Sequence, residues 1–191
     1  MSDFSNNVKE NIKRLETSLN VERNFDILQR EVVIAGRRAG FFFIDGFVQE
    51  DTVEKLIQFF YSLKESDMQS LDIFLEKGMP YTEVTRSGNV DYVITQFLSG
   101  VSIMTIDGFD ECLLIDCRTY PMRSVSEPWK DRVLRGSRDG FVETLVSNAA
   151  LLRRRIRDPR FSMELYGIGR RSRSDVAICY ISDSVDQSVL N

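Results

Sequence analysis

The chain is 191 residues long, which suits one large domain or two small ones. Apolar residues make up 42% of it and charged residues 28%, the composition of a soluble globular protein rather than of a disordered one. The sequence contains no histidine and has a formal net charge of −4. The absence of histidine excludes serine–histidine and cysteine–histidine hydrolases and any histidine-ligated metal centre.

The first part of the chain predicts helices on either side of a β-hairpin. Apolar residues recur at helical spacing over residues 8–19 and predict an amphipathic helix. Two apolar runs, residues 30–35 and 40–44, predict paired strands separated by Gly36-Arg37-Arg38. Further helices are expected over residues 50–63 and 71–76.

A second hairpin is predicted in the middle of the chain, after a helix over residues 90–98. Its strands are residues 101–106 and 112–117, joined by an Asp-Gly turn. In the second of these strands, alternate residues face opposite ways: Leu113, Ile115 and Cys117 on one side, Cys112, Leu114 and Asp116 on the other. A strand that is apolar on both faces belongs in a sheet covered by helices, which favours a layered α/β arrangement.

The three cysteines, Cys112, Cys117 and Cys179, are too few for a disulfide scaffold. Cys112 and Cys117 are five residues apart on one strand, so their side chains point to opposite faces and cannot pair with each other. We expect three buried free thiols.

The last third of the chain predicts a separate α/β unit. Residues 120–129 contain prolines and serines and are the candidate linker. A long helix is expected from Phe141 to Ile156, ended by Asp158-Pro159. Strands over residues 161–167 and 175–181 follow, joined by a basic turn. The predicted fold is therefore α/β with mixed sheets, in two small lobes over residues 1–125 and 126–191, each a short sheet flanked by helices, with truncation of the second lobe left open.

Charge is segregated along the chain. Residues 130–173 carry twelve basic and five acidic residues, net +7, against −11 in the remainder, and eleven of the twelve are arginine. Helix-dipole pairing and coverage of apolar surface by arginine stems explain part of this cluster. The rest indicates an acidic partner: another lobe, another subunit or anionic lipid headgroups. Nucleic acid is not expected, because no aromatic residues interleave the cluster.

Two stretches of the sequence resemble a known family. The first is residues 36–48, GRRAGFFFIDGFV; the second is residues 127–143, EPWKDRVLRGSRDGFVE, continued by Asn148 and by LLRRRIR at 151–157. Together they resemble the N-terminal domain of the GerA family of spore germination proteins, the A subunits of germinant receptors. The first stretch is most similar to the stage V sporulation protein AF branch. Receptor A subunits commonly have Gly-Pro-Arg where this chain has Gly136-Ser137-Arg138, which separates it more from the receptors than from the family.

The resemblance implies a two-lobed domain facing the cytosol from the inner membrane of the spore, without enzyme activity. No cofactor or metal is expected. The family's membrane-spanning region is not within this sequence. The implied role is assembly or signalling of a germinant receptor or ion-release complex. The implied partners are a permease-like B subunit and a lipoprotein C subunit, or a branch-specific membrane partner, together with self-association of the full-length protein.

The arginine cluster coincides with the second family stretch. We hypothesise that five of its members hold the lobe interface or a subunit contact, with the acidic first lobe as the nearest partner: Arg135, Arg138, Arg153, Arg154 and Arg155. No catalytic or metal-ligating residue is proposed. Two other functions remain open, namely a small-ligand-binding module that uses the cleft between the lobes and peripheral binding to anionic lipid.

Overall fold

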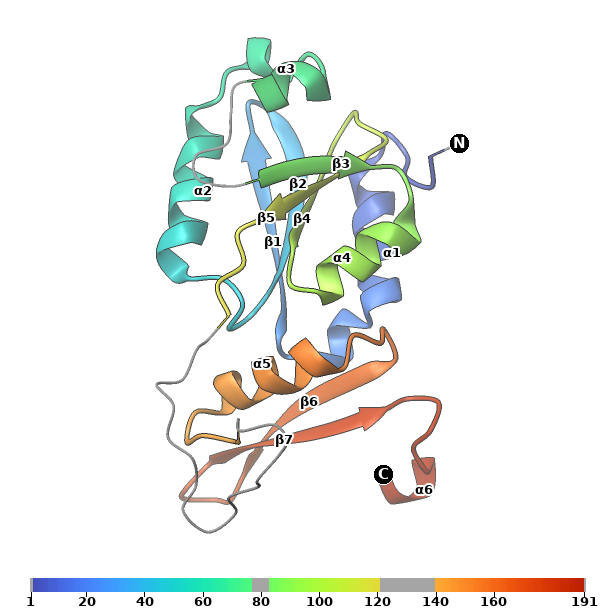
Figure 1. The fold of residues 1–191 in the computed structure, drawn as a ribbon, viewed down its shortest axis with the longest axis vertical. Helices are drawn as coiled ribbons and strands as arrows, with labels where there is room; N and C mark the ends of the chain where they lie inside the picture. Colours follow the sequence, from blue (N-terminus) through green and yellow to red (C-terminus); the bar gives the residue numbers. More distant parts are fainter. Residues whose placement is uncertain (1, 77–82, 121–139, 191) are drawn as a thin grey trace, which may run out of the picture.

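A computed structural model of the chain describes residues 2–76, 83–120 and 140–190, and its helices and strands form two β-sheets with their covering helices (Figure 1). The larger sheet has the strand order β1-β2-β4-β5-β3, and each neighbouring pair is antiparallel. Its strands are β1 (Ile27–Ile34), β2 (Arg37–Ile44), β3 (Glu83–Ser87), β4 (Ser102–Ile106) and β5 (Cys112–Asp116).

Helices cover both faces of the larger sheet. The helices on one face are α1 (Val8–Leu19) and α4 (Val90–Leu98); those on the other are α2 (Glu50–Ser62) and the short α3 (Leu71–Glu76). Leu15 and Phe97 belong to the core on the first face, whereas Phe60 and Phe74 belong to the core on the second. The helical spacings in the sequence located all four helices, because each one buries an apolar face against the sheet.

The strand β5 confirms the predicted alternation. Cys112 and Leu114 lie in the core beneath α1 and α4, and Leu113, Ile115 and Cys117 lie in the core beneath α2 and α3. The hairpin β4–β5 is antiparallel as expected. All three cysteines are free, but the expectation that all are buried is wrong for Cys179, which is exposed on an edge strand.

The first hairpin turns earlier than the sequence suggested. Ala35 and Gly36 have φ angles of 49° and 83°, and β1 and β2 pair from Ile34↔Arg37 onward. Two successive residues with positive φ form the tight turn that matches the twist of antiparallel strands. Arg37 and Arg38, which the sequence placed in the turn, therefore lie in β2.

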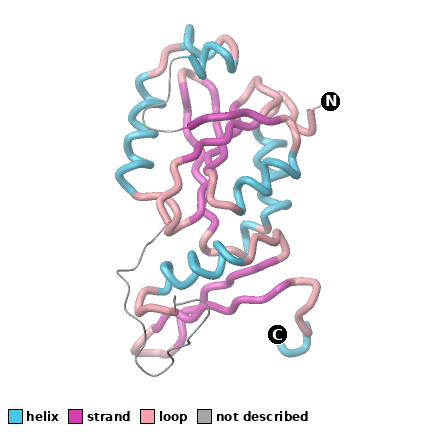
Figure 2. Tube along the Cα trace, viewed as in Figure 1, coloured by secondary structure: helices cyan, strands magenta, loops and turns pink. Residues whose placement is uncertain are grey.

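The smaller sheet consists of β6 (Phe161–Ile168) and β7 (Ser174–Ile181), which pair antiparallel along their full length. The helix α5 (Leu145–Arg155) packs on it, and the short α6 (Gln187–Leu190) follows β7. The tube in Figure 2 shows these elements gathered at one end of the molecule. The core between the smaller sheet and α5 is small, with Ala149, Phe161 and Met163 buried.

The helix expected from Phe141 is shorter than predicted. It begins at Leu145, and Phe141 lies outside it with 67% of its surface exposed. The Asn148 side chain accepts a hydrogen bond from the Val142 backbone N–H and donates one to the Val142 carbonyl oxygen, both at 2.7 Å. These bonds hold the segment before Leu145 in a non-helical conformation. The helical spacing of apolar residues therefore begins before the helix does.

The strand β3 and the helix α6 were not predicted. The strand β3 is five residues long, lies at the edge of the larger sheet and carries mostly exposed polar side chains, so it has no apolar pattern to detect. The predicted α/β class, with two sheets flanked by helices, is confirmed, and all strand pairs within the two sheets are antiparallel. The predicted boundary at residues 125/126 and the linker beyond Tyr120 lie outside the described residues.

Candidate functional site: the junction between the two sheets

The two sheets meet where the segment between α1 and β1 contacts α5 and β6. The helix α1 is capped by Asn20, whose backbone is left-handed, and a short 3-10 helix, η1 (Val21–Arg23), leads into Asn24. Asn24 and Met163 form a parallel β-bridge, and the Phe25 backbone N–H donates to the Met163 carbonyl oxygen at 3.0 Å. The end of α1 is thereby joined to the smaller sheet.

Arg153 is the central side chain of this junction and is fully buried. Its Nε and Nη2 donate to the two carboxylate oxygens of Asp26 at 2.8 and 2.9 Å, and both side chains are only 1% exposed. Nη1 donates to the Phe161 carbonyl oxygen at 3.1 Å, and the guanidinium carbon lies 4.9 Å from the Phe161 ring centroid. A planar arginine fork thus binds a carboxylate in a dry environment, the geometry that fixes orientation most strictly.

Asn24 satisfies the remaining polar groups at the junction. Its Nδ2 donates to the carbonyl oxygens of Leu19 and Asn20, both at 3.0 Å, which closes the C-terminus of α1. Its Oδ1 accepts from Arg153 Nη2 at 2.8 Å and from the Met163 backbone N–H at 3.0 Å. One amide therefore connects α1, α5 and β6, and any displacement of one element would leave a buried polar group without a partner.

Further contacts surround this polar centre. Asn20 Nδ2 donates to the buried Ser162 Oγ at 3.1 Å, and Arg23 Nη1 donates to the Tyr180 hydroxyl at 3.2 Å. Ala150 of α5 is buried within the core of the larger sheet, in which Phe47 also takes part. The junction thus combines apolar packing with buried ionic and amide contacts.

The predicted arginines have different environments. Arg153 lies at the junction, whereas its neighbour Arg154 is exposed and places its guanidinium carbon 4.6 Å from the Tyr120 ring centroid. Arg155 is exposed on the same helix. Arg135 and Arg138 lie outside the described residues.

Sequence reasoning missed Asn24 and Asp26. It proposed the acidic first lobe as the partner of the arginine cluster but could not choose among its many carboxylates. The one available signal was the pair of polar residues flanking Phe25 at the change from helix to strand.

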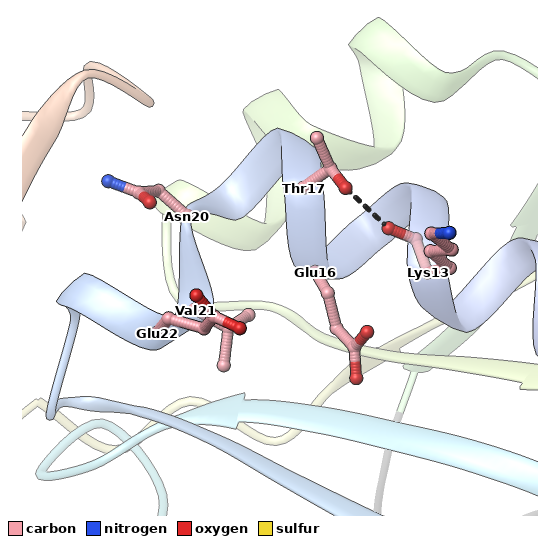
Figure 3. A pocket seen from close by; sticks show the side chains of 6 residues that line it. All are labelled: Lys13, Glu16, Thr17, Asn20, Val21 and Glu22. Atoms are coloured by element: carbon pink, nitrogen blue, oxygen red, sulfur yellow. Dashed lines mark hydrogen bonds between the residues drawn. The ribbon is translucent and has the colours of Figure 1, made fainter.

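Among the described residues, three hollows can be located from the residues that line them. A cavity of about 430 Å³ lies at the end of α1, lined by Lys13, Glu16, Thr17, Asn20, Val21 and Glu22 (Figure 3). A groove of about 600 Å³ runs between α2 and the first hairpin, where Phe43 and Tyr61 contribute apolar surface. A smaller one of about 260 Å³ lies beside α5, lined in part by Phe141 and Arg155. The first lies next to the junction, since Asn20 takes part in both.

The fold and the junction define a class of protein: a domain with two sheets, joined by a buried arginine–carboxylate pair. Residues 13–191 match the model of the family described as Bacillus/Clostridium GerA spore germination protein, and the chain belongs to this family. The resemblance derived from the sequence is confirmed.

Named relatives agree with this assignment. Stage V sporulation protein AF of Bacillus subtilis (strain 168) is 30% identical over 186 residues, which cover 96% of this chain and 38% of that protein. Spore germination protein KA of the same organism is 29% identical over 182 residues, covering 92% of this chain and 33% of that protein. The chain therefore spans between a third and two fifths of the length of these relatives.

A solved structure shares the fold. The N-terminal domain of the A subunit of the Bacillus megaterium spore germinant receptor GerK3 superimposes with a TM-score of 0.76 at 21% identity, covering 100% of this chain and 70% of that one. Within the described part of the chain, no helix has the length and apolar character needed to cross a membrane.

Proposed function

We propose that this chain is the non-enzymatic N-terminal domain of a spore germination protein of the spore inner membrane, facing the cytosol. Family membership across residues 13–191 supports the germination role, and the shared fold with a domain of a germinant receptor A subunit supports its place in a longer protein. In this proposal the two lobes are residues 1–125 and 126–191, and the domain serves assembly or signalling.

The observation that carries the proposal is the difference in burial between neighbouring arginines of α5. Arg153 points inward and is buried against Asp26, while Arg154 and Arg155 are exposed on the same helix. The buried pair holds α5 in a fixed orientation relative to the larger sheet, so the outward arginines are presented in a defined position. Preorganised charges of this kind favour the correct partner and disfavour others.

The proposed partners are the other subunits of a spore membrane complex. They are a permease-like B subunit and a lipoprotein C subunit, or a membrane partner specific to the stage V AF branch, with self-association as a further contact. An acidic surface on one of these proteins would complement the exposed arginines of α5.

Charge reversal on α5 in the full-length protein tests this role. The double variant Arg154→Glu/Arg155→Glu leaves Arg153 in place and is expected to lose copurification of the partner subunits and to slow germination. The matched control is Lys9→Glu/Arg38→Glu, which makes the same charge change at exposed positions of α1 and β2. Protein abundance in the spore is measured by immunoblot. Normal assembly and germination in the arginine variant, at wild-type abundance, would refute the proposed role of α5.

A second candidate function is a small-ligand-binding module, favoured by the cavity next to the junction. Its lining includes Lys13, Glu16 and Glu22, which offer both charges to a zwitterionic or polar ligand. A ligand at 100 times its dissociation constant would stabilise the domain by about 2.7 kcal/mol. Thermal-shift measurements with amino acids, sugars and inorganic anions test this function, and a shift that Lys13→Ala abolishes would support it over assembly.

A further inference from the structure

The outer face of the smaller sheet carries exposed apolar side chains in the part near the β6–β7 turn. Side chains alternate along β6 and β7, so Phe161 and Met163 face α5 whereas Tyr166, Ile168, Val176 and Ile178 face away from it. The latter four are between 38% and 54% exposed. Tyr166 lies directly opposite Val176 in the sheet, so the four form one continuous strip. Contiguous exposed apolar surface of this kind marks an interaction site.

The turn at the end of this strip is strongly basic. Residues 169–173 join β6 to β7 and include Arg170, Arg171 and Arg173, all of them exposed. None of the three forms an ion pair with a carboxylate of the described residues, in contrast to Arg153 and Arg160, which do. Three guanidinium groups with no ion-pair partner in the described part of the chain therefore adjoin the apolar strip.

The position and shape of this surface indicate what kind of partner it fits. The hairpin lies at the end of the molecule opposite α3 (Figure 1), and the strip on it is exposed there. The three hollows described above are lined by residues of α1, η1, α2, α5, the first hairpin and adjacent loops, whereas the strip lies on β6 and β7. A flat apolar strip with a cationic end fits the boundary between headgroups and acyl chains.

We propose that the turn and the outer face of β6–β7 form a docking surface for an anionic lipid bilayer. The three guanidinium groups bind headgroup phosphates, and Tyr166, Ile168, Val176 and Ile178 enter the interface beside them. Glu164 lies opposite Ile178, at the end of the strip farther from the turn, where the hydroxyls of Tyr166 and Tyr180 donate to its carboxylate, so its charge lies away from the three arginines. The inference does not rest on the proposed germination role, since it concerns this chain alone.

Vesicle cosedimentation of the 191-residue chain tests the proposal. Binding is expected to phosphatidylcholine vesicles that contain phosphatidylglycerol and not to vesicles of phosphatidylcholine alone, and it should weaken as salt screens the arginines. The triple variant Arg170→Glu/Arg171→Glu/Arg173→Glu is expected to lower the partition coefficient by at least roughly 100-fold. The double variant Ile168→Ser/Ile178→Ser should also weaken binding while leaving the charge unchanged.

The matched control is Lys9→Glu/Arg14→Glu/Arg38→Glu, which changes the net charge equally at exposed positions outside the smaller sheet. Circular dichroism checks that each variant is folded. No binding of the wild-type chain to anionic vesicles, or equal losses in both triple variants, would overturn the proposal. Concentration-dependent dimerisation that Ile168→Ser/Ile178→Ser abolishes would assign the strip to a second copy of the chain and would also overturn it.

Discussion

Arginine has three distinct roles in this chain, and the surroundings of each guanidinium group decide which one it takes. Arg153 is buried and donates four hydrogen bonds to protein groups, Arg154 lies over an aromatic ring, and Arg160 forms a local pair at the surface. Composition alone treats them as one basic cluster. Only the pair with a buried carboxylate imposes a strict geometry, because both partners are removed from water.

The surface pair Asp158–Arg160 allows a prediction about pH. Arg160 donates to both carboxylate oxygens of Asp158, at 2.9 and 2.6 Å, and its backbone N–H also donates to this carboxylate. These bonds lower the pKa of Asp158 from 3.8 to about 2. Because the pKa is lower in the folded state, the pair contributes stability above pH 3.8 that is lost as the pH falls towards 2. The contribution is small, since both side chains are partly exposed.

Carboxyl NMR titration measures this effect directly. In Arg160→Gln, the pKa of Asp158 should rise towards its ordinary value, because the guanidinium donors are gone. Arg157→Gln makes the same charge change one residue before Asp158 and should leave the pKa of Asp158 much lower than in Arg160→Gln. Equal pKa values in the two variants would contradict the proposed cause.

At the scale of elements, the turn after β2 sets how closely α5 approaches the larger sheet. Gly46 has a φ of 79°, and a Cβ added there would lie 3.1 Å from Ala150 Cβ and 3.3 Å from Val146 Cγ1. The glycine is required both for the left-handed backbone and for the close approach of the helix. The sequence alone did not show that α5 packs on this turn, because that helix lies about a hundred residues later.

Substitution of this glycine is a test of the packing. Gly46→Ala should lower the free energy of unfolding by about 1–3 kcal/mol, from the left-handed backbone and the crowded methyl group together. Gly167→Ala is the control, because no atom lies within 4 Å of the added Cβ, and its stability should change little. Chemical denaturation of both variants gives the comparison, and equal stabilities would rule out a tight contact at Gly46.

At the scale of the whole molecule, the smaller sheet depends on the junction for its stability. A two-stranded sheet is marginal by itself, and among the described residues the core of this one has Ala149, Phe161 and Met163 buried. The larger sheet has substantial cores on both faces. The contacts of Arg153 and Asn24 therefore decide whether both parts unfold together.

Removal of Arg153 should uncouple the two sheets. Arg153→Ala leaves the buried Asp26 carboxylate without its partner and should cost about 3–5 kcal/mol. Hydrogen exchange of the amides in β6 and β7 should accelerate more than that of β4 and β5. Arg154→Ala, at the exposed neighbouring position, is the control and should have a much smaller effect on both.

A double variant separates the cost of losing the ion pair from the cost of leaving one buried charge without a partner. Arg153→Met/Asp26→Leu removes both charges at once and should regain much of the lost stability, since no unpaired charge stays buried. The single variants Arg153→Met and Asp26→Leu complete the comparison. If their separate losses of stability add up to the loss in the double variant, the pair does not couple the sheets.

The sequence by itself determined the helices α1 to α4, the alternation of β5 and the family, because these depend on local periodicity and on residue order. It did not determine the strand β3, the true start of α5 or the exposure of Cys179, which depend on sheet position and on the side chain of Asn148. It located the basic cluster but not the single buried arginine within it. Only the tertiary structure decided that Arg153 meets Asp26, because the two residues are 127 positions apart and their pairing requires α5 to pack between the sheets.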